Sequence, residues 1–299
     1  MRLWDKILQK KELILACLVH ATVLIVFLLY LLWANTALVT THYTVTSAKL
    51  ARAFDGFRIA QISDLHSAEL DPGNHTLLSA LYSAKPDIIV FTGDILDAED
   101  ASATLHLIKE STQIAPCYYV AGNHEGFLLD TIYPDFEKAM IDMGVTILHD
   151  KSAVIERQGA SISIAGVDDS RFVEHLQYYG MMPDGYDGLG LEMNPECLKQ
   201  LITPNRFTIL LSHRPDFFAQ YAEAGFDLVL SGHIHGGQFR IPLLGGLVSP
   251  NKTFFPTYDS GMFSAGNTRM IVSRGIGNSV IPLRINNRPE LVVITLQCQ

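Results

Sequence analysis

Phe57-Arg-Ile-Ala-Gln-Ile-Ser-Asp-Leu-His66 is the stretch on which the fold prediction rests. Residues 57–63 are mostly apolar and are typical of a β-strand. Asp64 and His66 follow at the point where this strand ends. The stretch therefore predicts a strand that leads directly into a loop with metal-binding residue types.

Strand-like and helix-like segments alternate over the rest of the chain. Residues 87–92, Asp-Ile-Ile-Val-Phe-Thr, are typical of a buried strand bounded by Pro86 and Gly93. Residues 168–195 contain several glycines and prolines, and we expect an irregular surface excursion there. Such alternation predicts an α/β domain whose sheets are covered by helices. The other predicted helices span 74–84, 101–112 and 130–143 and start near 215, and the other predicted strands span 117–120, 145–148, 153–156, 161–167, 207–212 and 226–231, with strand and turn from 238 onward.

Five short polar fragments each begin where an apolar strand ends. Each fragment alone is a weak signal, because Asp-x-His and Gly-Asp occur by chance in turns and His-x-His is a common spacing. In α/β sheets, however, loops at the carboxyl ends of strands gather ligands in one crevice. Together and in this order, the fragments predict a single site. They are Asp64-Leu-His66, Gly93-Asp94, Gly122-Asn-His-Glu125, Ser212-His213 and Gly232-His-Ile-His235.

The fragments supply the ligand types of a centre with two divalent cations. Carboxylate and amide oxygens are hard ligands, and imidazoles are borderline ligands, so manganese, iron and zinc all fit the set. Asp94 can serve both cations, because a carboxylate can bridge two ions. Two cations about 3.5–4 Å apart can clamp a phosphoryl group and lower the pKa of water from about 15.7 toward neutrality, which makes hydroxide available as the nucleophile. The seven predicted metal ligands are Asp64, His66, Asp94, Asn123, His213, His233 and His235.

The order D-x-H, G-D, G-N-H-E, H and G-H-x-H resembles the calcineurin-like metallophosphoesterase superfamily. The stretches 54–66 and 232–238 are similar, more narrowly, to its membrane-anchored bacterial phosphodiesterase branch, as are 272–279 and 282–290. The resemblance covers about residues 50–297. It implies an α/β, four-layer sandwich of two mixed β-sheets flanked by α-helices, preceded by one N-terminal transmembrane helix.

The resemblance also implies a role for each position. His124 is similar to the family's catalytic histidine, which stabilises phosphoryl oxygens or protonates the leaving group. Hydrolysis of a phosphodiester, phosphomonoester or pyrophosphate by a dinuclear-metal-activated hydroxide is therefore expected. One cation would be held by Asp64, His66 and His235, the other by Asn123, His213 and His233, and both by Asp94.

Several residues near these fragments have two open interpretations. Arg214, Gln238, Arg274 and Asn278 either contact substrate phosphate or belong to the loops as structural residues. Asp168, Asp169 and Glu125 either support the metal ligands through hydrogen bonds or form turns.

Residues 13–33 are almost wholly apolar and long enough to cross a bilayer. The alternatives are a buried core helix and a cleaved signal peptide, but the run lacks a polar stripe and no clear cleavage site follows it. Basic residues precede the run, and no Lys or Arg follows it until Lys49. We therefore expect residues 1–12 to be a cytoplasmic basic flank, 13–33 a single-pass anchor in the cell membrane, 34–48 a polar linker, and 49–299 an extracytoplasmic metallophosphoesterase domain.

A formal net charge of -9 argues against nucleic acid as a partner. The membrane anchor favours a lipid-linked or envelope phosphate ester as the substrate, by analogy alone. The alternatives are a non-catalytic metal-binding scaffold on the membrane and a protein phosphatase. Four scattered cysteines form no C-x-x-C pair and predict no disulfide framework.

Overall fold

Two apolar cores lie on opposite faces of strand β3 (Ile88–Thr92), which explains why all five of its residues are buried. Ile88 and Val90 face one core, whereas Ile89 and Phe91 face the other. A strand covered on both faces has no polar alternation. The computed structural model describes residues 2–184, 186–250, 252–278 and 281–299.

The strands form two six-stranded sheets and one small hairpin. The first sheet has the order β1 (Val39–Ser47), β14 (Glu290–Cys298), β2 (Arg58–Ile62), β3, β4 (Cys117–Val120) and β5 (Thr146–Ile147). The second has the order β12 (Gly261–Ala265), β13 (Thr268–Val272), β9 (Leu228–Ser231), β8 (Thr208–Ser212), β7 (Ala160–Val167) and β6 (Lys151–Arg157). The hairpin pairs β10 (Arg240–Ile241) with β11 (Gly245–Gly246). Both six-stranded sheets are mixed, because each contains parallel and antiparallel pairs.

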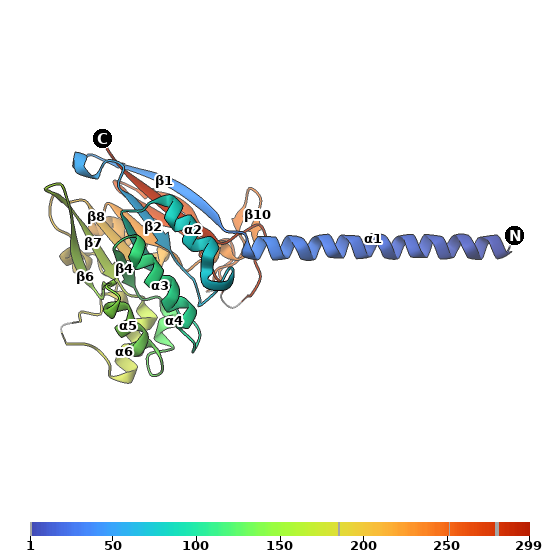
Figure 1. Cartoon of the computed structure of the whole chain (residues 1–299). Coiled ribbons are helices and arrows are strands. Elements are labelled where there is room, and N and C mark those ends of the chain that lie inside the picture. The colour runs from blue at the N-terminus through green and yellow to red at the C-terminus, as the bar shows by residue number, and fades with distance from the viewer. Residues whose placement is uncertain (1, 185, 251, 279–280) are drawn as a thin grey trace.

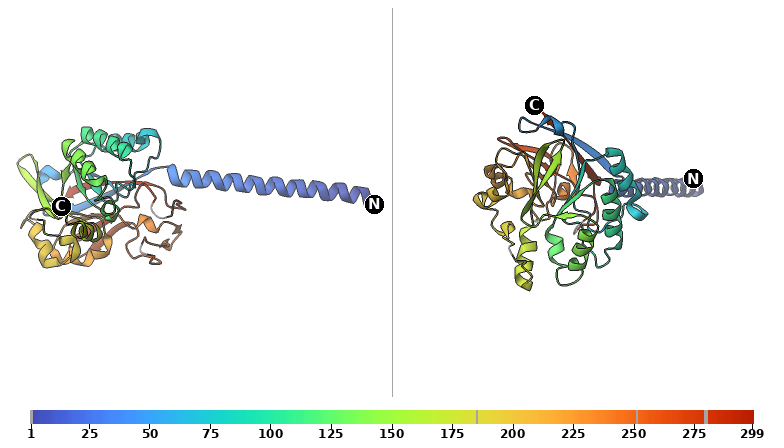
Figure 2. Two further views of the ribbon diagram at one scale, coloured as in Figure 1. Left: turned by 90° about the horizontal axis from the view of Figure 1, so that it is seen from below. Right: turned by 60° about the vertical axis from the view of Figure 1, so that its left-hand side comes forward.

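Helices cover the outer faces of both sheets (Figure 2). In α2, Leu77, Leu81 and Ala84 are buried at the i, i+4 and i+7 spacing of a single helix face. The core between the two sheets contains side chains from both, such as Val90 and Leu211. The predicted four-layer α/β sandwich is thus confirmed. The helices of the domain are α2 (His75–Ala84), α3 (Ser102–Ile114), α4 (Asn123–Gly126), α5 (Tyr133–Asp142), α6 (Ser170–Tyr179), α7 (Pro195–Leu198) and α8 (Phe218–Ala224), with short 3-10 turns at Arg52–Phe54, Pro72–Asn74, Leu189–Leu191, Lys199–Leu201, Pro215–Phe217 and His235–Gly237.

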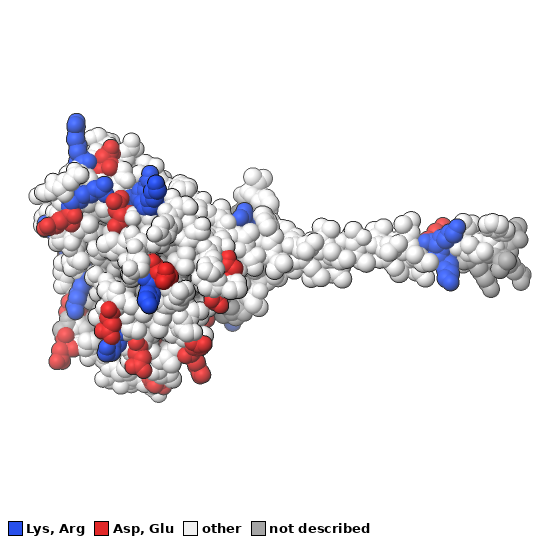
Figure 3. Space-filling model, in the orientation of Figure 1, with Lys and Arg blue, Asp and Glu red and all other residues white. Residues whose placement is uncertain are grey.

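The N-terminal helix α1 (Arg2–Thr36) projects from one side of the domain as a single rod (Figure 1). Its segment Ile7–Thr36 is long and apolar enough to cross a membrane, and the most apolar window is wholly unburied. Figure 3 shows charged side chains on α1 only toward its N-terminal end. A buried core helix is excluded, because no other part of the described chain covers this apolar window of α1.

The prediction of a linker over 34–48 is wrong. Helix α1 continues to Thr36, and residues 39–47 form β1, which pairs in parallel with β14 over nine residues. The threonines that make this stretch polar are β-branched residues that favour strands. The partner strand β14 lies some 250 residues away, so the sequence around residues 39–47 does not reveal that they form a strand.

The prediction of an irregular excursion over 168–195 is also wrong in part. Residues 170–179 form α6, which buries Phe172, Val173 and Leu176. Asp169 caps its first turn by accepting a hydrogen bond from the backbone N–H of Arg171. The glycines and prolines of this stretch lie beyond the helix, starting with Gly180.

Candidate metal centre

The five polar fragments meet where the carboxyl ends of parallel strands come together. Strands β2, β3 and β4 are parallel neighbours in the first sheet, and β8 and β9 are parallel neighbours in the second. The ends of the two sheets open on the same side, because His213 after β8 lies 3.0 Å from Asp94 after β3. Backbone bonds then join the loops: Asp64 N–H donates to the Gly93 carbonyl at 3.1 Å, and His66 N–H to the Asp94 carbonyl at 2.9 Å.

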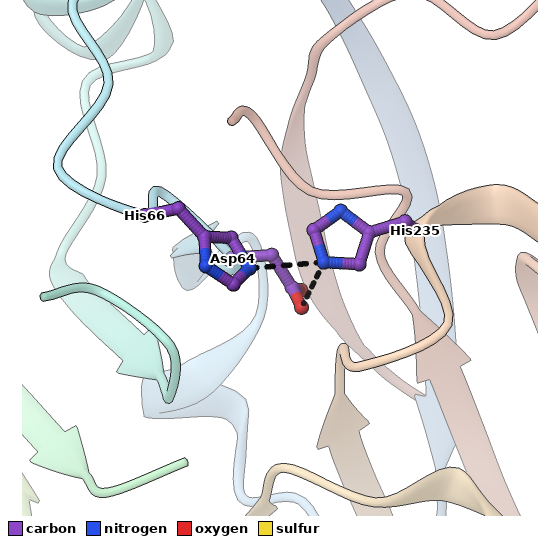
Figure 4. A group of neighbouring side chains, drawn as sticks. All are labelled: Asp64, His66 and His235. Carbon is purple, nitrogen blue, oxygen red and sulfur yellow. Dashed lines mark hydrogen bonds and ion pairs between the residues drawn. The ribbon is translucent and has the colours of Figure 1, made fainter. Parts of the chain in front are cut away.

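A first cluster consists of Asp64, His66 and His235 (Figure 4). The two Nε2 atoms of the imidazoles lie 3.0 Å apart, and His235 Nε2 lies 3.3 Å from Asp64 Oδ1. All three side chains are nearly or completely buried. The Asp64 carboxylate also accepts the backbone N–H of His233 at 2.9 Å, which fixes its orientation.

A second cluster consists of Asp94, His213 and His233. His213 Nε2 lies 3.0 Å from Asp94 Oδ2 and 3.2 Å from His233 Nδ1. The other ring nitrogen of His213 donates to the Thr92 carbonyl at 2.8 Å. That bond leaves Nε2 with a free lone pair directed into the cluster.

Asp94 joins the two clusters. Its Oδ2 lies 3.7 Å from His66 Nε2 and 4.0 Å from His124 Nε2, in addition to the contact with His213. Burial opposes ionisation of Asp94, but the nearby imidazoles outweigh it and lower the pKa of its carboxyl well below the usual value. A bridging position and an ionised state are the two properties that a ligand shared by two cations needs.

The backbone at the site is held in a conformation that few side chains adopt. Asp64, His66, Asp94, His233 and His235 all have positive φ angles, between 49° and 69°. Such left-handed residues cost roughly 1–3 kcal/mol each and persist only where the surroundings enforce them. With this backbone, Asp64 and His66 both reach the first cluster, whereas His233 reaches the second cluster and His235 the first.

Two glycines allow the loops to approach closely. A Cβ atom at Gly122 would lie 2.3 Å from Asp94 Oδ1, and one at Gly232 would lie 2.2 Å from Asp64 Oδ2. These positions explain why Gly precedes Asn123 and His233 in the fragments.

Glu125 holds the loops after β3 and β4 together through hydrogen bonds. Its buried carboxylate accepts backbone N–H groups from Asp94 at 3.1 Å, Ile95 at 2.6 Å, Leu96 at 3.1 Å and Gly122 at 2.9 Å. Glu125 therefore supports the loop of Asp94 through hydrogen bonds and is not merely a turn residue.

Asn123, the first residue of α4, is buried beside these loops. Its Oδ1 atom has no hydrogen-bond partner among the described residues. A buried amide oxygen without a partner is costly, and a cation would satisfy it.

Asp97 is a residue that the sequence analysis missed. Its two carboxylate oxygens contact His66 Nδ1 at 3.0 Å and His124 Nδ1 at 2.7 Å, so both Nε2 atoms face the clusters. Burial opposes its ionisation, but the hydrogen bonds with His124 and His66 outweigh it and lower the pKa of Asp97 to about 2. The available signal was a second acidic residue in Gly93-Asp-Ile-Leu-Asp97.

His124 lies at the rim of the clusters, with a fifth of its side chain exposed. Burial opposes protonation of its ring, but the hydrogen bond to Asp97 and the charge of Asp94 outweigh it and raise the pKa of His124 to about 9. The imidazolium can donate from Nε2 to an oxygen in the site.

The four residues considered for phosphate contact all have partners within the protein. Arg214 Nε donates to Asp169 at 2.6 Å, Arg274 to Glu290 at 2.8 Å, Gln238 to two backbone carbonyls, and Asn278 accepts from Arg284. These bonds agree with a structural role in the loops for Arg214, Arg274, Gln238 and Asn278. Asp168 supports the loop after β4, because its Oδ1 accepts the backbone N–H of Ala121, just before Gly122.

The ligand atoms present fit divalent cations. Bonds of about 2.0–2.2 Å to nitrogen and oxygen place neighbouring ligands of one cation about 3.0–3.5 Å apart. The facing pairs His66–His235, His235–Asp64, His213–Asp94 and His213–His233 have separations of 3.0, 3.3, 3.0 and 3.2 Å. Two imidazole Nε2 atoms at 3.0 Å gain little from each other alone, and a shared cation would explain their approach.

The model of the calcineurin-like phosphoesterase family matches residues 57–237, which include all five fragments. The chain belongs to this calcineurin-like phosphoesterase family. A relative from Bacillus subtilis, the uncharacterized metallophosphoesterase YkuE, is 31% identical over 265 residues, covering 86% of this chain and 85% of that protein. The phosphodiesterase YaeI of Escherichia coli is 26% identical, covering 80% and 82% of the two chains.

A third relative is a transmembrane protein with a metallophosphoesterase domain from Danio rerio. It is 29% identical over 261 residues, covering 83% of this chain and 55% of that protein. Family membership and the site together make this chain a metallophosphoesterase, a hydrolase that acts on phosphoric ester bonds.

Proposed function

We propose that the chain hydrolyses a phosphodiester with two divalent cations, one in each cluster, and that Asp94 bridges them. The position of Asp94 carries the proposal, because its carboxylate lies within 3.0 Å of His213 and 3.7 Å of His66, which belong to different clusters. The first cation would be held by Asp64, His66 and His235, and the second by Asn123, His213 and His233. Manganese, iron and zinc all suit these nitrogen and oxygen donors.

Two bound cations would supply Lewis acidity toward a phosphoryl group and a source of hydroxide near neutral pH. The protein's own residues then do three things. The clustered ligands position the ester at the ends of the two sheets. His124, held as an imidazolium by Asp97, donates from Nε2 to a phosphoryl or leaving-group oxygen. Glu125 keeps Asp94 in place through the backbone N–H bonds of its loop.

A diester is the proposed substrate because the relative YaeI is named a phosphodiesterase. Membrane anchoring by α1, with the domain outside the cell membrane, is also part of the proposal. It is supported by the apolar length of α1, by the basic residues that precede the span, and by the relative named a transmembrane protein. The proposed substrate also carries a lipid tail, because a membrane anchor would keep the site near the bilayer.

The test uses the full chain in detergent micelles. Metal content is measured first, and hydrolysis of an aryl phosphodiester and of an aryl phosphomonoester is then compared with manganese, iron or zinc added. We expect close to two cations per chain and faster diester hydrolysis. Asp94→Asn should reduce both metal content and rate, the rate by about 10²-fold or more.

Matched controls are available on the exposed surface. Asp142→Asn alters an exposed carboxylate on α5, and His106→Ala alters an exposed histidine on α3; both should retain full rate. His124→Ala should retain metal and lose rate by about 10²-fold. A chain that binds metal but hydrolyses no phosphoric ester under any of these conditions would instead be a scaffold.

A further inference from the structure

The end of α1 is bonded to a group of loops that expose large apolar side chains. Tyr30, near the end of α1, donates its hydroxyl to Asn286 Oδ1 at 2.8 Å and accepts the Asn286 backbone N–H at 2.9 Å. Asn286 in turn donates from Nδ2 to the Arg240 carbonyl at 3.3 Å, and Arg240 N–H donates to the Ile285 carbonyl. Arg240 begins the β10–β11 hairpin. The position of this hairpin relative to α1 is therefore fixed by hydrogen bonds.

The hairpin tip presents apolar residues to solvent. Residues 241–244, Ile-Pro-Leu-Leu, are all exposed, and Leu243 is fully exposed. Leu243 also has a φ of 71°, a left-handed conformation that glycine or asparagine adopts more easily. A fully exposed leucine in a strained turn has no role in packing the domain, so its apolar side chain needs another environment.

A second loop lies directly beside the hairpin. The Phe255 N–H donates to the Leu247 carbonyl at 3.0 Å, and Val248 pairs with Phe254 across the loop. Residues 252–255 are all exposed and include Phe254 and Phe255, with Lys252 among them. We call residues 241–244 and 252–255 the apolar rim.

The apolar rim lies on the side of the domain from which α1 departs. Figure 2 shows the orange and brown loops of this region beside the base of α1. In Figure 3 most charged side chains lie on the part of the domain away from α1, and few lie around its base. Apolar groups with an occasional lysine are typical of surfaces that enter the headgroup region of a bilayer.

We propose that the apolar rim inserts into the outer part of the lipid bilayer that α1 crosses. The rim then seats the domain on the membrane, with α1 and the rim as two contacts on one side. His235 is only eight positions before Leu243 in the chain, and Gln238 between them bonds the carbonyls of Ile281 and Leu283. A short segment, residues 235–243, therefore connects the first cluster to the apolar rim, and hydrogen bonds of Gln238 hold this segment in place.

The inference rests on the proposed anchoring by α1 and not on hydrolysis. A lipid bilayer is the occupant that fits, because α1 already requires one at this side and Tyr30 and Trp33 are suited to its interface. A second copy of the chain or another protein on the rim is the alternative that the test distinguishes.

The test measures the depth of single tryptophans in the full chain, reconstituted in nanodiscs with or without brominated phospholipid. Leu243→Trp adds a tryptophan to the rim, and Tyr178→Trp adds one to an exposed site on α6. The wild-type chain gives the background of Trp4 and Trp33. We expect the added emission of Leu243→Trp to fall about twofold or more with brominated lipid, as for a shallow interfacial side chain, and that of Tyr178→Trp to stay unchanged.

Two results would overturn the proposal. Added emission from Leu243→Trp that is quenched no more than that from Tyr178→Trp means that the rim does not enter lipid. Blue-shifted but unquenched emission means that protein covers the rim instead. Thermal unfolding of both variants checks their folding, and hydrolysis of a soluble aryl phosphodiester by both tests the proposed function separately.

Discussion

Asn35, in the last turn of α1, makes two hydrogen bonds with the backbone of Arg284, whose side chain reaches His235. Arg284 N–H donates to Asn35 Oδ1 at 2.8 Å, and Asn35 Nδ2 donates to the Arg284 carbonyl at 3.2 Å. The guanidinium of Arg284 is completely buried, and its terminal nitrogen lies 3.4 Å from His235 Nδ1. One residue therefore connects the apolar helix to a predicted metal ligand.

Replacing Arg284 by methionine should destabilise the protein strongly. The change leaves the buried Gly277 carbonyl without its donor, and it does the same to the partly buried Arg274 carbonyl and Asn278 Oδ1. We expect the free energy of unfolding to fall by about 3 kcal/mol, because buried acceptors lose their partners. Thermal unfolding of the full chain in detergent measures the effect.

Arg269→Met is the matched control for that change. Arg269 also donates to backbone carbonyls, those of Gly266 and Thr268, but it is only partly buried on β13. We expect a change of at most about 0.5 kcal/mol. Equal effects of the two substitutions would contradict a special role for Arg284.

Asp97→Asn should shift the pH dependence of hydrolysis. Asp97 holds the pKa of His124 at about 9, so its loss should lower that pKa toward the ordinary value near 6.5. If His124 acts while protonated, the basic limb of the rate profile moves to lower pH, and the rate itself falls about 10–100-fold. Rates with a soluble diester across the pH range provide the measurement.

Asp100→Asn controls for loss of a carboxylate in the same loop. Asp100 is exposed and accepts the Ser102 N–H at the start of α3. Its replacement should leave the rate profile unchanged. A profile that keeps its basic limb in Asp97→Asn would mean that Asp97 orients the rings without setting the proton on His124.

The sequence predicted the four-layer α/β fold and the strands that end at the clusters. Strands such as β3 were predictable because burial on both faces leaves an unbroken apolar run between Pro86 and Gly93. Strand β1 was not predictable, since its polar threonines become a strand only through pairing with β14. Local patterns carry no information about a partner that lies at the other end of the chain.

The same limit applies to the site. Asp64, His66, Asp94, His213, His233 and His235 lie in the clusters that the sequence predicted, while their roles as ligands remain a prediction. Asp97 was missed because one more acidic residue in a loop has no distinctive spacing. Its role depends on two imidazoles that meet it in space, and only the fold brings His66 and His124 to the same carboxylate.

His149 should make the stability of the domain depend on alkaline pH. Its ring bonds Asp168 Oδ2 at 2.6 Å and Glu137 Oε2 at 2.7 Å. Burial opposes protonation of His149, but these two carboxylates outweigh it and raise its pKa to about 10. The stabilisation is present in full below the ordinary pKa of about 6.5 and is lost as the pH rises through about 10, so its size is on the order of a few kcal/mol.

Urea unfolding of the full chain at several pH values measures this effect. Between about pH 7.5 and 10 the wild type should lose stability faster than His149→Gln, whose side chain does not titrate. Asp150 does not contribute to the loss of stability between about pH 7.5 and 10, because burial raises its pKa only to about 7. Parallel curves for the two proteins would contradict a charged His149 in the folded state.

Gly122→Ala should remove metal from the site while the fold persists. The new Cβ would lie 2.3 Å from Asp94 Oδ1, so that either the carboxylate or the loop after β4 must move. Displacement of the side chain that joins the two clusters weakens both at once. We therefore expect metal content to fall below one cation per chain and the rate to drop by about 10²-fold, as for loss of a properly oriented ligand.

Gly126→Ala, at the end of the same short helix, separates this effect from general disturbance of α4. Its Cβ would meet His175 Nδ1 at 2.7 Å and the backbone of α6 at 3.1 Å, and its three nearest atoms include no carboxylate oxygen. This variant should lose some stability in thermal unfolding and keep its cations. Metal analysis of both variants measures the difference, and retention of two cations by Gly122→Ala would contradict the displacement of Asp94 by the new Cβ.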